Sequence, residues 1–465
     1  METKLINEYF TDPQHPDEGA VKGFRQGDWF SRTDYQHDAW YACWLNEFVT
    51  GYGMALYDKR TDTDFLGRAE KILNMLLSGR QQKDGLFPII CYLEEDGTRT
   101  WLNDDGWAGY YQDYHTMMMS WNGYLMLKWA EEIFPDRKEE ILNFLTPYAD
   151  FLLRVMLPSG NIPAWFGEDG KPSREQFREF NAETGMSAAF LMEMGDITGR
   201  SELIEAGYKS LDFVSREVRP RERWFDMETF KSCAQKHFGF YDSITAQYPQ
   251  CNLSLMYAVL AYQKRYELEP TSENLKEMTE VVDYLCMFQQ LWNHPEISID
   301  VFGGFTVQNA DNEWNDIRES IMAVELYKTY EYTGEWEYME RGVTAMQSGF
   351  PPLPYENWAH CGYEGMQYDS SLLWGGGVAM MAAEFYRDAI GDAAFDVKSG
   401  KGIAAFGTYR FSIREEGDTL EITADQDHDL GSFRIFGAEH SFNISVNGKA
   451  AGSFTADQLK EKIVL

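Results

Sequence analysis

The chain of 465 residues carries 41 basic and 75 acidic side chains, which gives a formal net charge of −34 at neutral pH. This excess of negative charge repels nucleic acid phosphates and anionic membrane surfaces, so we expect neither kind of partner. No run of residues is long and apolar enough to span a bilayer, and the first residues lack the apolar core of a signal peptide, which predicts a cytoplasmic protein.

Apolar residues recur at helical spacing in pairs of segments along most of the chain. The predicted pairs cover about 34–57 and 63–79, 113–134 and 137–157, 181–197 and 201–218, 250–267 and 272–292, and 315–332 and 336–348, and one further helix covers about 370–389. The connection within a pair is short, whereas a long loop rich in glycine, proline and aromatic residues precedes the next pair.

The repeat of paired helices, roughly sixty to seventy-five residues long, predicts stacked helical hairpins. Common open solenoids have shorter periods, about 34 to 47 residues, and a closed ring would place every long loop at one end. We therefore predict a mainly α fold, an (α/α)6 toroid over residues 1–395, in which the first helix of each pair lines the inner ring.

The last part of the chain changes to the period-two alternation of strands, seen at 409–413, 419–422, 432–436 and 442–448. This pattern predicts a small antiparallel β domain over residues 396–465. No catalytic set of residues stands out in it, so we expect a structural or accessory role.

The six cysteines and eight histidines are scattered through the sequence. The cysteines form no CxxC pair, and the histidines form no HExxH or other compact ligand set. We therefore expect reduced, mostly buried thiols, no bound metal and no cofactor.

Candidate functional residues cluster where the first helix of each pair begins. Asp113 is an example, because it marks the change from a polar, aromatic loop to an apolar helix. Aspartate is a preferred N-cap residue, so capping is one reading of Asp113. In a toroid, however, such junctions converge at one mouth, where helix dipoles favour negative charge. Glycoside chemistry needs a proton donor and a second carboxylate or a positioned water, and facing acids at one mouth meet that need.

Two motifs at these junctions resemble a known family. The segment His37-Asp38-Ala39-Trp40 resembles the opening of an inner helix in the unsaturated glucuronyl hydrolases, glycoside hydrolase family 88, and Asp113-Tyr114-His115-Thr116-Met117-Met118 resembles the start of a later inner helix there and in family 105. These are six-hairpin glycosidases, a superfamily that also includes the β-glucuronidases of family 154. The resemblance covers about residues 34–389, and segments 312–316 and 356–360 have no counterpart in it. It implies that Asp38 and Asp113 are the two catalytic aspartates, with Asp113 as general acid/base.

The remaining candidates would bind substrate. Aromatic residues in or beside the long loops are expected to form stacking platforms, and Arg318 or His360 is expected to clamp a carboxylate. The binding candidates are His37, His115, Trp165, Glu183, Trp314, Arg318, Asn357, Trp358 and His360. Structural readings stand beside these roles: Asp38 as a cap, the histidines as satisfied polar residues, and Arg318 as the partner of a neighbouring acid.

Four functions are compatible with the sequence. The first is a glycoside hydrolase that removes a terminal uronic acid, glucuronic or 4,5-unsaturated, from an oligosaccharide. The second is a polysaccharide lyase in which Tyr35 or Tyr114, with His37 or His115, abstracts the C5 proton of a uronate. The third is a sugar epimerase, and the fourth is a non-catalytic glycan-binding protein.

Overall fold

Helical hairpins make up most of the computed structural model, which describes residues 26–27, 35–42, 46–61, 63, 65–93, 98–104, 112–231, 236–293, 300–309, 313–315, 318–351, 361–362, 365–366, 374–407, 409–424 and 430–465. The hairpin helices are α3 (Glu47–Thr61) with α4 (Phe65–Leu77), α5 (Thr116–Glu132) with α6 (Lys138–Val155), α7 (Thr184–Thr198) with α8 (Ser201–Phe213), α10 (Asn252–Leu268) with α11 (Ser272–Cys286), and α12 (Glu319–Thr333) with α13 (Trp336–Ser348). A short helix, α9 (Met227–Lys231), precedes α10, and α14 (Trp374–Ile390) follows the last pair.

The two helices of a hairpin differ in how they are buried. The first helix is buried on all sides: α5, for example, buries Met117, Met118 and Met119 in succession, although consecutive residues of a helix point in different directions. The second helix buries one stripe, as α4 does with Ala69, Leu73 and Leu76. The first helices therefore form an inner layer and the second helices an outer layer.

The inner helices close into a ring. Among the described helices, α3 contacts α5, α5 contacts α7, α7 contacts α10, α10 contacts α12, α12 contacts α14, and α14 returns to α3. One continuous hydrophobic core runs through all of these elements. The predicted (α/α)6 toroid is therefore confirmed. No helix in the described part of the chain is long and apolar enough to cross a membrane.

The far end of the ring, where the inner helices end, is held by polar contacts between neighbours. The Lys264 ammonium of α10 lies 3.0 Å from a Glu193 oxygen and 2.7 Å from an Asp196 oxygen of α7. Nearer the other end, the Ser120 hydroxyl of α5 lies 3.0 Å from the Ser187 hydroxyl of α7, and both residues are in the first turns of their helices. Neighbouring inner helices thus run parallel, so their N-terminal ends all meet at the opposite end of the ring.

The first predicted helix begins too early. Residues Tyr35–Trp40 form strand β2, and α3 starts only at Glu47. β2 lies between β1 (Gln26–Gly27) and β3 (Ile90–Leu93), and β3 pairs in turn with β4 (Arg99–Leu102). Pairing with strands distant in the chain overrides the local pattern, so Asp38 lies opposite Tyr92 on a strand rather than at a helix start.

Short strands also form inside the other long loops. β5 (Tyr114–His115) pairs with β6 (Trp165–Phe166), and β7 (Glu313–Asn315), β8 (Cys361–Gly362) and β9 (Gly365–Met366) form a small antiparallel sheet. These pairings fix loop backbones at the end of the ring where the inner helices begin.

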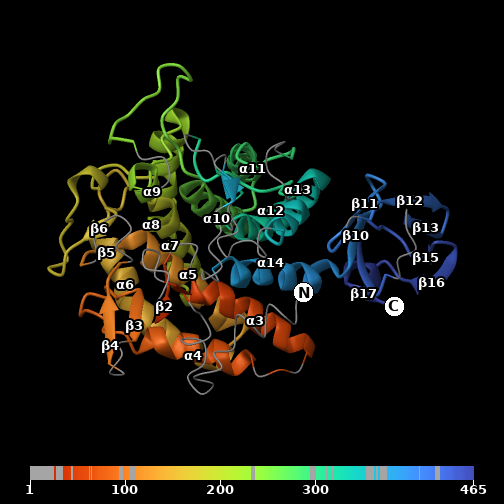
Figure 1. Cartoon of the computed structure of the whole chain (residues 1–465), viewed down its shortest axis with the longest axis horizontal. Helices are drawn as coiled ribbons and strands as arrows, with labels where there is room; N and C mark the ends of the chain where they lie inside the picture. The colour runs from red at the N-terminus through yellow and green to blue at the C-terminus, as the bar shows by residue number, and fades with distance from the viewer. Residues whose placement is uncertain are drawn as a thin grey trace.

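The C-terminal strands form two four-stranded sheets around a second hydrophobic core. The strands are β10 (Ala393–Asp396), β11 (Lys401–Ala404), β12 (Phe411–Glu416), β13 (Thr419–Ala424), β14 (Ser432–Phe436), β15 (Phe442–Val446), β16 (Lys449–Phe454) and β17 (Ile463–Val464). Neighbours are antiparallel as predicted, except that β10 pairs with β14 and β13 with β15 in parallel. Figure 1 shows these strands at one side of the molecule, with α14 running toward them.

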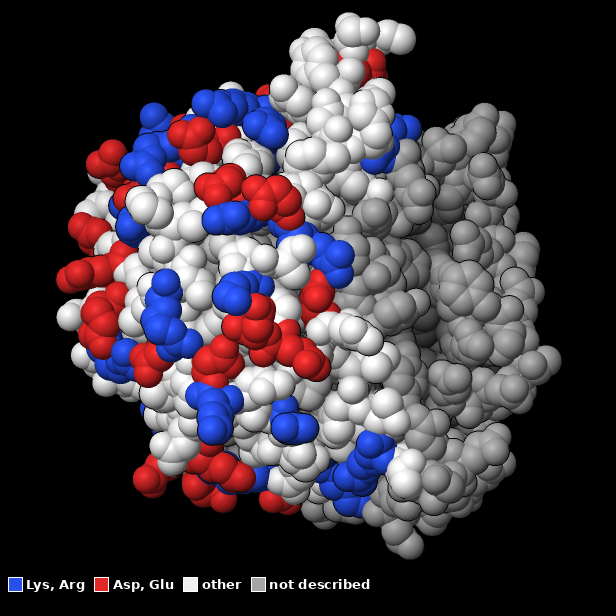
Figure 2. Space-filling view, turned by 90° about the vertical axis from the view of Figure 1, so that its left-hand side faces the viewer, with Lys and Arg blue, Asp and Glu red and all other residues white. Residues whose placement is uncertain are grey.

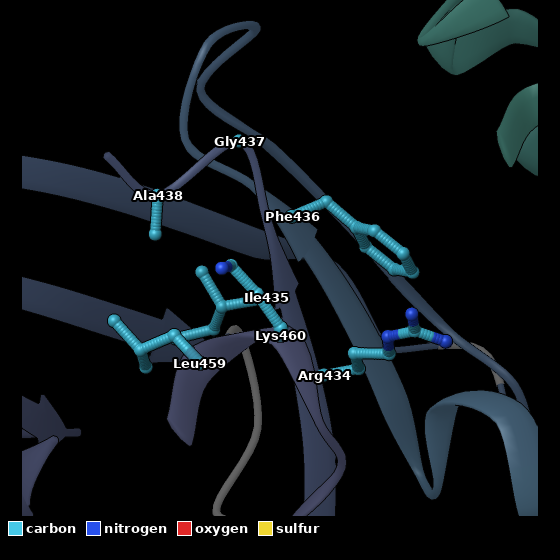
Figure 3. Close-up of a pocket in the computed structure, with 7 residues that line it drawn as sticks. All are labelled: Arg434, Ile435, Phe436, Gly437, Ala438, Leu459 and Lys460. Carbon is cyan, nitrogen blue, oxygen red and sulfur yellow. The ribbon is translucent and has the colours of Figure 1, made fainter. Parts of the chain in front are cut away.

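Strand β14 contacts the ring with one face and the second core with the other. The Arg434 guanidinium donates to the Tyr327 hydroxyl at 2.6 Å, and the Phe436 ring meets Tyr330 edge-on at 5.0 Å between centroids. Ile435 instead joins the core of the sheets. Figure 3 shows this alternation, with Arg434 and Phe436 on one side of a small pocket of about 140 Å³ and Leu459 on the other.

Substitution of Gly53 tests the contact between α3 and α14 that closes the ring, which we call the seam. A Cβ atom at Gly53 would lie 2.8 Å from the Met381 backbone of α14, so Gly53→Val forces α3 away from α14. We expect a loss of about 1–3 kcal/mol in the free energy of unfolding, measured by chemical denaturation. The control is Lys59→Val, an exposed position of the same helix that carries only the intrinsic cost of valine. Equal stability of the two variants would contradict the close seam.

Candidate functional site

Polar and charged residues occupy the N-cap positions of four inner helices in the described structure: His115 for α5, Glu183 for α7, Cys251 for α10 and Arg318 for α12. None of these side chains caps its own helix. They reach sideways instead, toward the neighbouring elements of the ring. The mouth of the toroid therefore carries a continuous set of buried polar contacts.

His115 is the centre of the first part of this set. Its Nε2 atom lies 2.7 Å from a Glu183 carboxylate oxygen, and its Nδ1 atom lies 3.7 Å from an Asp104 oxygen. The imidazole stacks on the Trp165 ring at 3.9 Å between centroids, with an angle of 9° between the planes. All four side chains are buried, so the imidazole is fixed between two carboxylates and an aromatic face.

Glu183 and Asp226 extend the set to the next helices. The second oxygen of Glu183 accepts a hydrogen bond from the Met227 backbone N–H at 2.7 Å, at the start of α9. Asp226 accepts from the backbone N–H groups of Thr229 and Ser254, the latter in the first turn of α10. Burial, and then the charge of Glu183, raise the pKa of the Asp226 carboxyl above its ordinary value.

Asp113 is also buried, but less completely than these acids. One of its oxygens, Oδ2, accepts from the Ser173 hydroxyl at 3.0 Å and forms an ion pair with Arg174. The Asp113 side chain is 13% exposed and that of Arg174 is 34% exposed. Capping, the alternative reading of Asp113 from sequence, does not hold: the N-cap is His115, and Asp113 lies two residues before it.

Two binding candidates are more deeply buried than the sequence implied. Trp165 stacks on His115 in the interior and does not offer its face to solvent. Arg318 is 2% exposed, with one guanidinium nitrogen 3.9 Å from the Cys251 sulfur. Both side chains therefore take part in the buried contacts of the mouth.

The other candidates lie where the side chains are not described. His37 and Asp38 lie on β2 and Trp314 on β7, and only their backbones are described. Asn357, Trp358 and His360 lie outside the described residues. The backbone nevertheless places the β2 sheet near Asp113, because the Asn103 side chain, directly after β4, donates to the Gln112 carbonyl at 2.8 Å.

Sequence reasoning missed Asp104, Ser173, Arg174 and Asp226. Asp104 and Asp226 were hidden in loops, although the spacing Asp226-x-x-Thr229 is typical of an aspartate that caps a local turn. Arg174 is brought to Asp113 by the pairing of β5 with β6, and spacing along the chain gives no sign of that contact. In the part of the chain that the structure describes, no group of three His, Cys, Asp or Glu side chains could hold a metal ion.

The surface near Asp113 carries charges of both signs. Figure 2 shows the side of the molecule on which β5 and β6 lie in Figure 1, and acidic and basic side chains alternate over its coloured part. In the loop that follows β6, ion pairs join Lys171 to Asp169 and Arg178 to Glu175. Local positive charge is therefore present near the mouth in spite of the net charge of −34.

Comparison with solved structures identifies the fold. Over 83% of this chain and 99% of its own length, a sugar epimerase from a ruminal bacterium is similar, with a TM-score of 0.51 and 11% identity. A D-mannose isomerase is similar over 83% and 96% (TM-score 0.54, 12% identity), and a family 76 glycoside hydrolase, a mannosidase from Bacteroides thetaiotaomicron, over 82% and 95% (TM-score 0.51, 12% identity). No family model and no curated protein matches the sequence. At these identities the likeness shows the (α/α)6 fold alone.

The raised pKa of Asp226 has a consequence for stability. The folded protein holds this proton more tightly than the unfolded chain, so the wild type loses stability as the pH rises from the ordinary value of 3.8 through the raised one. Asp226→Asn cannot ionise. We expect the unfolding free energy of the variant minus that of the wild type to increase between about pH 4 and 7, measured by urea denaturation.

Asp242→Asn is the control of opposite sign. Hydrogen bonds from the Ile244 backbone N–H and the Thr245 hydroxyl lower the pKa of exposed Asp242, so its stabilisation is lost as the pH falls. The prediction is wrong if the unfolding free energy of Asp226→Asn minus that of the wild type stays constant or decreases as the pH rises. Either result would show that ionisation of Asp226 does not destabilise the folded protein.

Proposed function

We propose that this protein is a carbohydrate-active enzyme, a glycoside hydrolase whose substrate binds at the end of the ring where the inner helices begin. The observation that supports this most directly is that Asp113 is the least completely buried of the four acids described above. Asp104, Glu183 and Asp226 are at most 1% exposed, whereas the Asp113 side chain, although also buried, keeps 13% exposure. Asp113 is therefore the acid that can touch a glycosidic oxygen directly, and we assign it as general acid/base.

The second carboxylate of the proposed mechanism is Asp38, on the motif resemblance. Its strand belongs to the sheet that reaches Gln112 through Asn103, which supports pairing Asp38 with Asp113. One acid protonates the leaving oxygen, and the other supports the attack of water or of the carboxylate itself. The solved structures on this fold, which include a mannosidase, are compatible with glycoside hydrolysis.

The substrate we propose is an oligosaccharide with a terminal uronic acid, glucuronic or 4,5-unsaturated. Two considerations support a charged substrate: the motif resemblance to uronyl hydrolases, and the presence of a guanidinium beside the assigned acid. A carboxylate entering this strongly acidic protein needs such a local partner.

A sugar epimerase or isomerase is the second candidate. It is favoured by His115, whose imidazole lies between Asp104 and Glu183 in the arrangement that holds a proton-transferring histidine. The epimerase and isomerase among the similar structures are compatible with it. Against it, His115 is completely buried, so a substrate reaches its ring only if the mouth opens.

A polysaccharide lyase is less well supported. Tyr114, one of the candidate bases, is buried, and its hydroxyl accepts a hydrogen bond from the Gln82 side chain at 3.0 Å. Burial raises the pKa of Tyr114, which makes the tyrosinate base harder to form near neutral pH.

The reaction class is tested with wild-type protein and uronide oligosaccharides. A hydrolase that acts on unsaturated ends removes the ultraviolet absorbance of the double bond, a lyase creates it, and a hydrolase of saturated ends releases glucuronate without an absorbance change. An epimerase leaves the mass unchanged and incorporates solvent deuterium beside the carbonyl carbon, which NMR detects. We expect release of the terminal uronic acid, and deuterium incorporation without hydrolysis would replace this proposal by the second candidate.

Asp113→Asn tests the assigned acid. The amide keeps the shape of the side chain and removes the transferable proton, so we expect kcat to fall by at least about a hundredfold. The matched control is Asp169→Asn, an exposed aspartate of the adjoining loop that pairs with Lys171, and it should retain wild-type turnover. Near-normal turnover by the Asp113→Asn protein would reject the assignment.

A further inference from the structure

Ser173 and Arg174 follow a tight turn after strand β6. The turn is closed by the Gly167 N–H, which donates to the Lys171 carbonyl at 2.9 Å, and the Ser173 N–H donates back to the Trp165 carbonyl at 3.0 Å. Because β6 pairs with β5, this hairpin ends beside Asp113. The backbone therefore holds Ser173 and Arg174 beside the assigned acid.

Asp113 and Arg174 form an ion pair in which Asp113 is buried and Arg174 is partly exposed. The same Asp113 oxygen, Oδ2, receives both the Ser173 hydroxyl and the Arg174 guanidinium. With about a third of its side chain exposed, Arg174 is open to a ligand, unlike buried Arg318. Solvent reaches the pair from the Arg174 side, so a ligand carboxylate can compete with Asp113 for the guanidinium.

We propose that Arg174 binds the carboxylate of the terminal uronic acid, and that this binding releases Asp113 from the ion pair. The inference rests on the function proposed above. A guanidinium presents a planar fork of donors that matches a carboxylate at two points, so a uronate can replace Asp113 as its partner. Asp113 then keeps the Ser173 hydroxyl as a partner, and its Oδ2 atom becomes available to the glycosidic oxygen.

Exchange of the ion pair would couple recognition to catalysis. A neutral sugar has no carboxylate to offer, so Arg174 stays on Asp113 and occupies the acid that the reaction needs. A uronate carboxylate replaces Asp113 as the partner of Arg174, and Asp113 leaves the ion pair in the same step. Selectivity for the charged sugar would then appear in kcat as well as in KM.

The test measures binding first, so that it does not depend on turnover. Isothermal titration calorimetry measures the binding of D-glucuronate and D-glucose to the wild type, Arg174→Gln and Arg174→Lys. We expect the wild type to bind glucuronate more tightly than glucose. The affinity for glucuronate should fall at least tenfold in Arg174→Gln and be partly retained in Arg174→Lys. Arg178→Gln, at an exposed arginine of the next turn that pairs with Glu175, should match wild type. Melting temperatures of all variants report folding.

Turnover of a glucuronide and the matching neutral glucoside then tests the coupling. We expect Arg174→Gln to lose kcat/KM for the glucuronide at least tenfold while the glucoside rate stays the same or rises. Equal losses on both substrates, or wild type that binds glucuronate no better than glucose, would overturn the inference. If wild type hydrolyses neither glycoside but binds glucuronate through Arg174, the proposed reaction fails while carboxylate recognition by Arg174 stands.

Discussion

Closure of the inner ring is the constraint on which the rest of the structure depends. An inner helix such as α5 is apolar on every side, so it is stable only when neighbours cover it all round. The contact between α14 and α3, made close by Gly53, supplies the last of these neighbours. The outer helices need to bury only one stripe each, which is why they are amphipathic.

The ring also explains why acids gather at its mouth. Parallel inner helices bring their unpaired N–H groups to one end, and each needs an acceptor. Asp226 is such an acceptor, for the Ser254 N–H of α10, and Glu183 accepts in the same way from the Met227 N–H at the start of the short helix α9. These carboxylates therefore stabilise the ends of helices at the same mouth where we propose that the substrate binds. Asp113 differs from them because its partners, Ser173 and Arg174, are side chains of a surface loop.

Much of the helical fold could be predicted from the sequence, because the period of apolar residues is local information. Helix α13 was placed to the residue at Trp336–Ser348, and the starts of α8 and α11 were correct. The segment Tyr35–Trp40 was misjudged because its strand is created by β3, about fifty residues away.

The site could be predicted only in part, since its key contacts join residues distant in the chain. The helix junctions drew attention to Asp113, His115 and Glu183, and the structure brings His115 and Glu183 into direct contact. The partners Arg174 and Asp226 come from other hairpins, and the spacing of residues along the chain does not show which loop folds back on which helix.

Strand β14 contacts both hydrophobic cores, and this links the stability of the C-terminal sheets to that of the ring. If the C-terminal sheets unfolded alone, Tyr330 would lose its contact with Phe436, and Tyr327 would lose its hydrogen bond from Arg434. The sheets and the ring therefore stabilise one another and should unfold together as a single thermodynamic unit.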